Sequence, residues 1–145
     1  MSNIFNENNI NICDDQVSWQ DAINLSAKPL LDEGYISEGY TKAIFKNIEK
    51  FGPYIDFGQE IAVPHARPEC GVKKTGVSLL KLNNMVNLND DKEHPIKIII
   101  TFCSVDDTSH IEILKKISSI FGDLRKIKKI KEANNKEEIL EVINN

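Results

Sequence analysis

The sequence has few cysteines, no long apolar run and no excess of positive charge. Its three cysteines are irregularly spaced with no CxxC pair, which indicates reduced thiols and not a disulfide framework. The longest apolar run, Ile96 to Cys103, is interrupted by Lys97 and is too short to cross a bilayer, so we expect no insertion into the membrane. A net charge of −4 argues against a general nucleic-acid-binding surface. The first residues lack the pattern of a signal peptide, so we expect a cytoplasmic protein.

Two common catalytic patterns are also missing. No GxSxG occurs, which argues against a serine hydrolase of the α/β type. His65, Cys70 and His110 could in principle bind zinc, but only the first two are close in the sequence and no HExxH is present. We therefore expect no metal site, although these residues leave that alternative open.

The composition is that of an ordinary globular protein. With 145 residues, of which 41% are hydrophobic and 28% charged, the chain suits a single domain over residues 1–145. The first fifteen or so residues are rich in Asn and are expected to be loosely ordered.

Apolar residues at helical spacing predict two helices in the first third of the chain. The first begins after Ser18 as N-cap, meets Pro29, which should kink it or end it early, and stops at Gly34. The second begins after Ser37 and ends at Gly52.

Three further helices are predicted after the middle of the chain. One starts near Thr108 or Ser109, a short one covers residues 123–133, and a last one follows a capping box at Asn135-Lys-Glu-Glu138. The short helix carries the one basic cluster, which we interpret as a solvated helix face and which consists of Arg125, Lys126, Lys128, Lys129 and Lys131.

Between these helices the apolar period changes to that of strands. The runs Ile61–Val63, Val77–Leu82 and Ile96–Cys103 are bounded by Gly, Pro, Asn and Asp, and Val86–Leu88 is a candidate short edge strand. Ile96–Cys103 is apolar at nearly every position, as in a central strand covered on both faces. The order of helices, strands and helices predicts an α/β fold with a mixed β-sheet flanked by helices.

The most informative residues are two histidines that follow strands. His65, in Pro64-His65-Ala66, comes directly after Ile61–Val63, and His110 lies in the first turn of the helix after Ile96–Cys103. Reactive groups of α/β sheets gather at strand ends, and helix N-termini favour anions such as phosphate. The pair thus suggests a phosphoryl site, with His65 as nucleophile and His110 stabilising the transferred group. A structural or solvent-exposed role remains open for each histidine at this point.

Other polar residues have weaker patterns. Arg67 could hold phosphate oxygens, whereas Lys73 and Lys74 are more typical of a solvated loop. His94 stands next to a proline in a polar stretch, which favours a surface loop.

Both histidine segments resemble motifs of a known family. Ile61-Ala-Val-Pro-His65-Ala resembles the phosphorylation-site motif of enzyme IIA components, mannitol/fructose type, of the bacterial phosphoenolpyruvate-dependent sugar phosphotransferase system. Thr108-Ser-His110-Ile-Glu-Ile resembles the second histidine motif of that family. The stretch from Phe51 to Leu79 is similar more specifically to the ascorbate branch. The resemblance runs from about Trp19 to the C-terminus.

The resemblance implies a phosphoryl relay and a mixed sheet flanked by helices. His65 would become a tele-phosphohistidine, accepting its phosphoryl group from HPr and passing it to a cysteine of the IIB component. The membrane component IIC would then import the sugar, with ascorbate or a related sugar acid as the expected substrate. His110 would support the transfer, and no cofactor is implied.

One position departs from the family pattern. The mannitol branch has an arginine at the end of the helix before the site, where this chain has Glu49-Lys50. Lys50 and Arg67 are the candidates for that charge. Phe57, Ile61 and Val63 are candidates for an apolar rim around His65, with core packing as the equal alternative.

Two other functions are compatible with the same resemblance. A regulatory IIA-like phosphoprotein would act by binding and not by transport, but the separate domains usual for that role are not seen. A non-catalytic module would keep only the fold, and the presence of both His65 and His110 argues against it.

Overall fold

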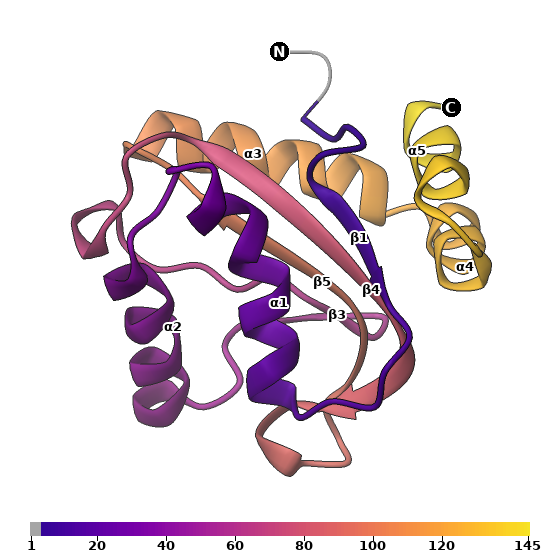
Figure 1. Cartoon of the computed structure of the whole chain (residues 1–145), viewed down its shortest axis with the longest axis horizontal. Helices are drawn as coiled ribbons and strands as arrows, with labels where there is room; N and C mark the ends of the chain where they lie inside the picture. Colours follow the sequence, from indigo (N-terminus) through magenta and orange to yellow (C-terminus); the bar gives the residue numbers. More distant parts are fainter. Residues whose placement is uncertain (1–3) are drawn as a thin grey trace.

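A five-stranded mixed sheet crosses the computed structural model, which describes residues 4–145 (Figure 1). The strand order is β1-β4-β5-β3-β2. The β1–β4 and β3–β5 pairs are parallel, whereas β4–β5 and β2–β3 are antiparallel. The strands are β1 (Ile10–Cys13), β2 (Asp56–Gly58), β3 (Ile61–Ala62), β4 (Gly76–Asn87) and β5 (Pro95–Cys103).

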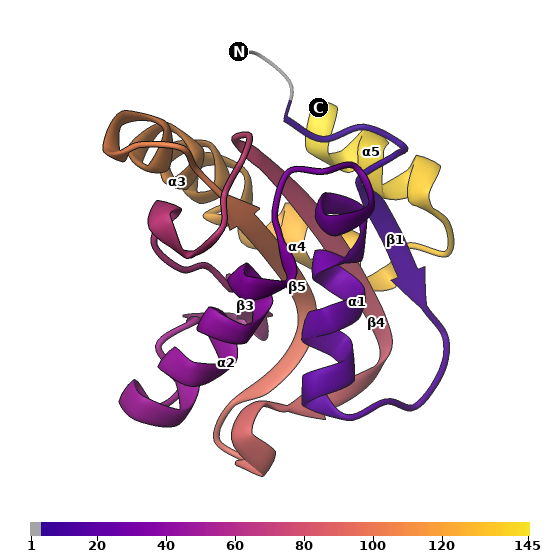
Figure 2. The ribbon, with the colours of Figure 1, turned by 60° about the vertical axis from the view of Figure 1, so that its left-hand side comes forward.

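Helices cover both faces of this sheet (Figure 2). The helices α1 (Trp19–Asp32) and α2 (Glu38–Phe51) pack on one face. The helices α3 (Asp107–Phe121), α4 (Leu124–Glu132) and α5 (Lys136–Asn144) pack on the other. The predicted α/β fold with a mixed sheet between helices is confirmed. None of the helices within residues 4–145 is long and apolar enough to cross a membrane.

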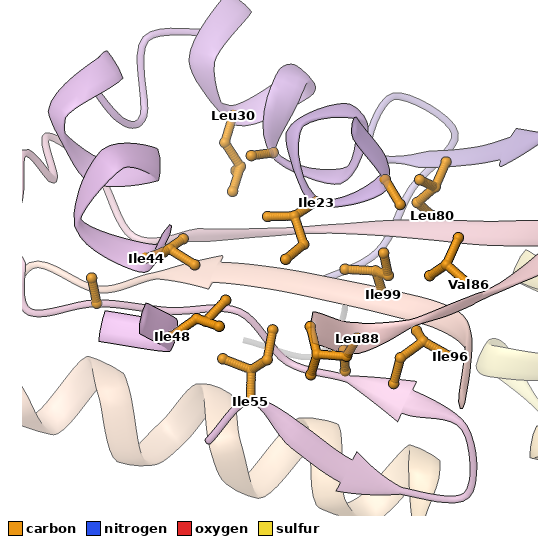
Figure 3. Close-up of a cluster of buried hydrophobic side chains, with 14 of the residues drawn as sticks. Ile23, Leu30, Ile44, Ile48, Ile55, Leu80, Val86, Leu88, Ile96 and Ile99 are labelled. Carbon is orange, nitrogen blue, oxygen red and sulfur yellow. The ribbon is translucent and has the colours of Figure 1, made fainter. Parts of the chain in front are cut away.

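The sheet separates two layers of buried side chains, and its central strand β5 contributes to both layers. Ile99 and Cys103 point to the side of α1 and α2, while Ile98, Ile100 and Phe102 point to the side of α3, as alternation along a strand requires. Figure 3 shows part of the first layer, where Ile23 of α1 and Ile44 of α2 approach the sheet. The prediction of a central strand buried on both faces is confirmed.

Side-chain caps begin four of the helices within residues 4–145, namely α1, α3, α4 and α5. The Ser18 hydroxyl accepts a hydrogen bond from the Asp21 N–H at 3.0 Å, and the Asn135 side chain accepts one from the Glu138 N–H at 2.9 Å, as predicted. The helix α3 begins at Asp107, one residue before the predicted start near Thr108 or Ser109, because the Asp106 carboxylate caps it.

Three local predictions are wrong. Residues 10–13 are not loosely ordered but form β1, because Ile10 and the nearby Phe5 bury apolar side chains that the Asn-rich composition obscures. Of the two outcomes predicted at Pro29, a kink or an early end, the early end is wrong, because α1 runs through Pro29 to Asp32; a proline in the last turn removes only one hydrogen bond. Val86 is not on an edge strand; it continues β4 and pairs with β5 after an irregularity in the register.

Candidate functional site

The parallel pairing of β3 with β5 brings the two predicted histidines together. His65 follows the carboxyl end of β3, and His110 lies in the first turn of α3, which follows the carboxyl end of β5. Both residues therefore reach the same edge of the sheet. The two imidazole centroids are 5.6 Å apart with the rings nearly perpendicular, so the predicted meeting of His65 and His110 is confirmed.

Aromatic rings surround the imidazole of His65. The Phe102 ring, which is fully buried, stacks on it with centroids 4.8 Å apart and planes 22° apart, and also contacts His110 at 5.1 Å. The Tyr54 ring meets it edge-on at 5.6 Å. This burial, together with the neighbouring His110, lowers the pKa of His65 below its ordinary value of 6.5. The imidazole is therefore neutral at neutral pH.

A single backbone contact sets the tautomer of His65. Its Nδ1 lies 2.8 Å from the carbonyl oxygen of Val63, which can only accept a hydrogen bond. We therefore assign the proton to Nδ1. The lone pair of the neutral ring is then on Nε2, the tele nitrogen.

A buried hydroxyl lies beside His110. The Oγ of Ser104 is 3.5 Å from Nδ1 of His110, and Ser104 is buried at the end of β5. If this hydroxyl donates to Nδ1, the proton of His110 is on Nε2, and that N–H is available as a donor. The backbone N–H of His110 bonds to the Asp106 carbonyl at 3.1 Å, which fixes the residue in the helix.

Two tyrosines hold the backbone next to the imidazole. The Tyr54 hydroxyl donates to the carbonyl of His65 at 2.5 Å. The Tyr40 hydroxyl accepts from the Ala66 N–H at 2.9 Å and donates to the Phe102 carbonyl at 2.7 Å. Burial raises the pKa of both tyrosines, so their hydroxyls stay protonated.

Sequence reasoning missed both tyrosines. Tyr40 was assigned only to the apolar stripe of its helix, and Tyr54 lies in the segment after α2. The hydrogen bonds from Tyr40 span 26 and 62 residues, so no local pattern could indicate them. The only available signal was the presence of tyrosine, and not phenylalanine, at a position predicted to be buried.

Neither of the two predicted cations contacts His65 within residues 4–145. Arg67 is 81% exposed and pairs with Glu69 at 2.7 Å, and that partner raises the pKa of the guanidinium. The Lys50 ammonium lies over the Phe51 ring, 5.2 Å from its centroid. Among residues 4–145, neither side chain makes a hydrogen bond or aromatic contact with His65.

The remaining candidates were an apolar rim, His94 and a metal site. Ile61 and Val63 pack in the core instead of forming a rim, whereas Phe57 is 38% exposed. His94, which was predicted to lie in a surface loop, is partly exposed and bonds to the Asp56 carboxylate at 2.6 Å, which raises the pKa of the imidazole. In the part of the chain that the structure describes, no three potential metal ligands gather in one place.

The basic cluster lies on α4, where it was predicted to be a solvated face. Its apolar side, Ile127 and Ile130, is buried against the core, and its cations are exposed or partly exposed. Lys131 pairs with Glu60 at 2.8 Å.

The fold and the histidine pair define an α/β domain with a neutral histidine at the carboxyl end of a sheet strand. The chain belongs to the EIIA 2 family of the phosphoenolpyruvate-dependent sugar phosphotransferase system, whose model matches residues 3–145. Components of this family are phosphotransferases.

Relatives with two sugar names are almost equally similar. The mannitol-specific cryptic phosphotransferase enzyme IIA component of Escherichia coli (strain K12) is 35% identical over 143 residues, covering 99% of this chain and 97% of the relative. The ascorbate-specific EIIA component of the same strain is 34% identical over 127 residues, covering 87% and 82%. Overall identity therefore does not separate these specificities.

Solved structures match the whole fold. The solution structure of the mannitol-specific cryptic enzyme IIA CmtB from Escherichia coli superposes with a TM-score of 0.89 at 34% identity, covering 97% of this chain and 95% of that one. The complex of enzyme IIAMtl with phosphorylated enzyme IIBMtl from Escherichia coli matches with a TM-score of 0.82 at 22% identity, covering 96% of each chain, which compares the fold alone.

Proposed function

We propose that this protein is a phosphoryl carrier of the sugar phosphotransferase system, in which Nε2 of His65 accepts a phosphoryl group from phospho-HPr and passes it to a cysteine of a IIB component. The observation that carries this proposal is the contact between Nδ1 of His65 and the Val63 carbonyl, which leaves the lone pair on Nε2. The lowered pKa of His65 keeps that lone pair unprotonated at neutral pH.

The transfer balances without a proton leaving His65. A bond forms between Nε2 and phosphorus while the bond between phosphorus and the donor nitrogen breaks, and its electron pair returns to the donor imidazole. The ring of His65 then carries a hydrogen on Nδ1 and phosphorus on Nε2, so it gains positive charge. The Val63 carbonyl accepts the Nδ1–H bond and stabilises this charge. Reversal of the same bonds, with a thiolate as acceptor, passes the group to IIB.

His110 supports the transfer from the other side of the site. A ring centred 5.6 Å from that of His65 can donate an Nε2–H bond to an oxygen of the transferring group. Phosphoryl transfer requires mainly positioning and charge stabilisation, and a donor already in place provides both. The partners contribute the remaining contacts when they dock.

The comparisons support the choice of partner and substrate class. A structurally similar IIA of the mannitol system forms a complex with its phosphorylated IIB, and we propose a IIB component as the acceptor here. We propose ascorbate or a related sugar acid as the transported substrate, based on the resemblance of residues 51–79 and on the ascorbate-specific relative. A carrier between HPr and IIB works in the cytoplasm and reaches the membrane component IIC only through IIB.

The proposal is tested by phosphorylation in a purified system. The protein is incubated with phosphoenolpyruvate, enzyme I and HPr, and the attached phosphate is located by mass spectrometry. We expect one acid-labile phosphate on the wild type and on His94→Ala, and none on His65→Ala. His94 is the matched control, because it is a histidine outside the site. Normal labelling of His65→Ala would refute the assignment.

The substrate class needs the next component of the relay. The phosphorylated protein is mixed in turn with purified ascorbate-type and mannitol-type IIB domains. We expect faster loss of phosphate to the ascorbate-type domain, and preferential transfer to the mannitol-type domain would overturn that choice.

A further inference from the structure

Tyr54 contacts His65 in two ways. Its hydroxyl donates to the main-chain carbonyl of His65 at 2.5 Å, and the edge of its ring meets the imidazole with centroids 5.6 Å apart. We propose that Tyr54 is a positioning residue for phosphoryl transfer, which holds the His65 backbone so that Nε2 faces the incoming group. This inference rests on the proposed function of His65.

The backbone at His65 has left the sheet and needs other partners. The strand β3 ends at Ala62, and the pairing toward β5 ends with the bond from the Phe102 N–H to the Pro64 carbonyl at 3.2 Å. The next peptide group joins His65 to Ala66. Its carbonyl is bound by Tyr54, and its N–H is bound by the Tyr40 hydroxyl at 2.9 Å. One peptide group is therefore held at both ends by two tyrosines.

This peptide group controls where the imidazole points. The bond between Nδ1 and the Val63 carbonyl, at 2.8 Å, exists only while the backbone of His65 keeps its orientation relative to residue 63. Stacking on Phe102 fixes the ring plane but permits sliding within it. If the carbonyl of His65 loses Tyr54, the peptide can rotate about the remaining bond to Tyr40. The contact between Nδ1 and the Val63 carbonyl then weakens, and His65 becomes a mixture of its two neutral tautomers.

Tyr54 is itself held in place. Burial raises the pKa of the Tyr54 phenol, so its hydroxyl remains a donor. The backbone N–H of Tyr54 bonds to the Gly52 carbonyl at 2.8 Å, just after α2 ends. The hydroxyl therefore reaches His65 from a fixed helix end and not from a free loop.

The substitution Tyr54→Phe tests this role, because it removes the hydroxyl and keeps the ring. With purified phospho-HPr as donor, we expect kcat for phosphorylation of His65 to fall about fivefold, the usual effect of one hydrogen bond, and KM for the donor to change less than about twofold. The matched control is Tyr35→Phe, whose ring lies under Lys74 away from His65, and it should transfer at the wild-type rate.

A second measurement does not depend on transfer. Nitrogen-15 NMR of the unphosphorylated protein reports the tautomer of His65. We expect one dominant Nδ1–H form in wild type and in Tyr35→Phe, and a mixture of forms in Tyr54→Phe. A wild-type protein that is not phosphorylated on His65 would refute the proposed function, while the NMR comparison would still test the positioning. Unchanged kcat together with an unchanged tautomer in Tyr54→Phe would overturn the inference.

Discussion

The Tyr40 hydroxyl contributes both to the stability of the fold and to the geometry of the site. Tyr40 is fully buried, and its hydroxyl bonds to the Ala66 N–H and the Phe102 carbonyl. Tyr40→Phe keeps the ring but leaves both backbone groups buried without this partner. Each lost bond costs about 1 kcal/mol, and the unpaired groups add to that, so we expect about 2–3 kcal/mol less stability. For 145 residues, unfolding entropy of about 2.1 cal/mol/K per residue converts this to a fall in Tm of about 8 °C.

Calorimetry and urea unfolding at pH 7 measure this change. Tyr35→Phe is the control, because the Tyr35 hydroxyl makes no hydrogen bond within residues 4–145. The Tm of this variant should stay within about 2 °C of wild type. The m-value of Tyr40→Phe should equal that of wild type, because the same surface is exposed on unfolding. A Tm within 2 °C of wild type would refute the reasoning, since it would mean that the Ala66 N–H and the Phe102 carbonyl find other partners at no cost.

Two further predictions concern the histidines. His110→Ala should fold with a Tm within about 3 °C of wild type, because the His110 side chain is only partly buried. The substitution should lower the rate of phosphoryl transfer to His65 about 100-fold, because it removes one hydrogen-bond donor. An unchanged transfer rate in stopped-flow assays would rule out the supporting role. Because burial lowers the pKa of His65, the transfer rate should decline at low pH with a midpoint below 6.5. The stability due to the neutral imidazole should be lost as the pH falls from 6.5 toward the lowered pKa. Titration of the transfer rate and of the His65 resonances measures this, and a midpoint at or above 6.5 would contradict it.

The sequence allowed prediction of most helices, the central strand and the histidine pair. Caps and apolar periods are local, so Ser18 and Asn135 could be assigned as helix starts from a few neighbouring residues. His65 and His110 could be paired because each follows a strand, and strand ends meet when the strands are parallel neighbours. The class of fold was predictable for the same reason, since it depends on the order of elements more than on any single contact.

The features that could not be predicted depend on contacts distant in the sequence. The strand β1 has only four residues, and its order comes from pairing with β4, whose partner residues lie about seventy positions later. The contact of Tyr40 with Phe102 spans 62 residues, and it exists only because α2 packs beside the end of β5. Propensity contains no information on such contacts, so the tyrosines around His65 could be found only in the folded protein.

Within residues 4–145, neither of the predicted cations contacts His65, and this fits the proposed role of a phosphoryl carrier. Among the described residues, Arg67 is exposed and paired with Glu69, and Lys50 lies over a phenyl ring. A cation fixed against the phosphohistidine would stabilise the phosphorylated state as well as the transition state, and such uniform binding slows release. An uncharged N–H donor stabilises a phosphoryl group less in the ground state than a fixed cation does. In the proposed relay, a site held in position by hydrogen bonds and without a fixed cation against the phosphohistidine would favour passage of the phosphoryl group over its retention.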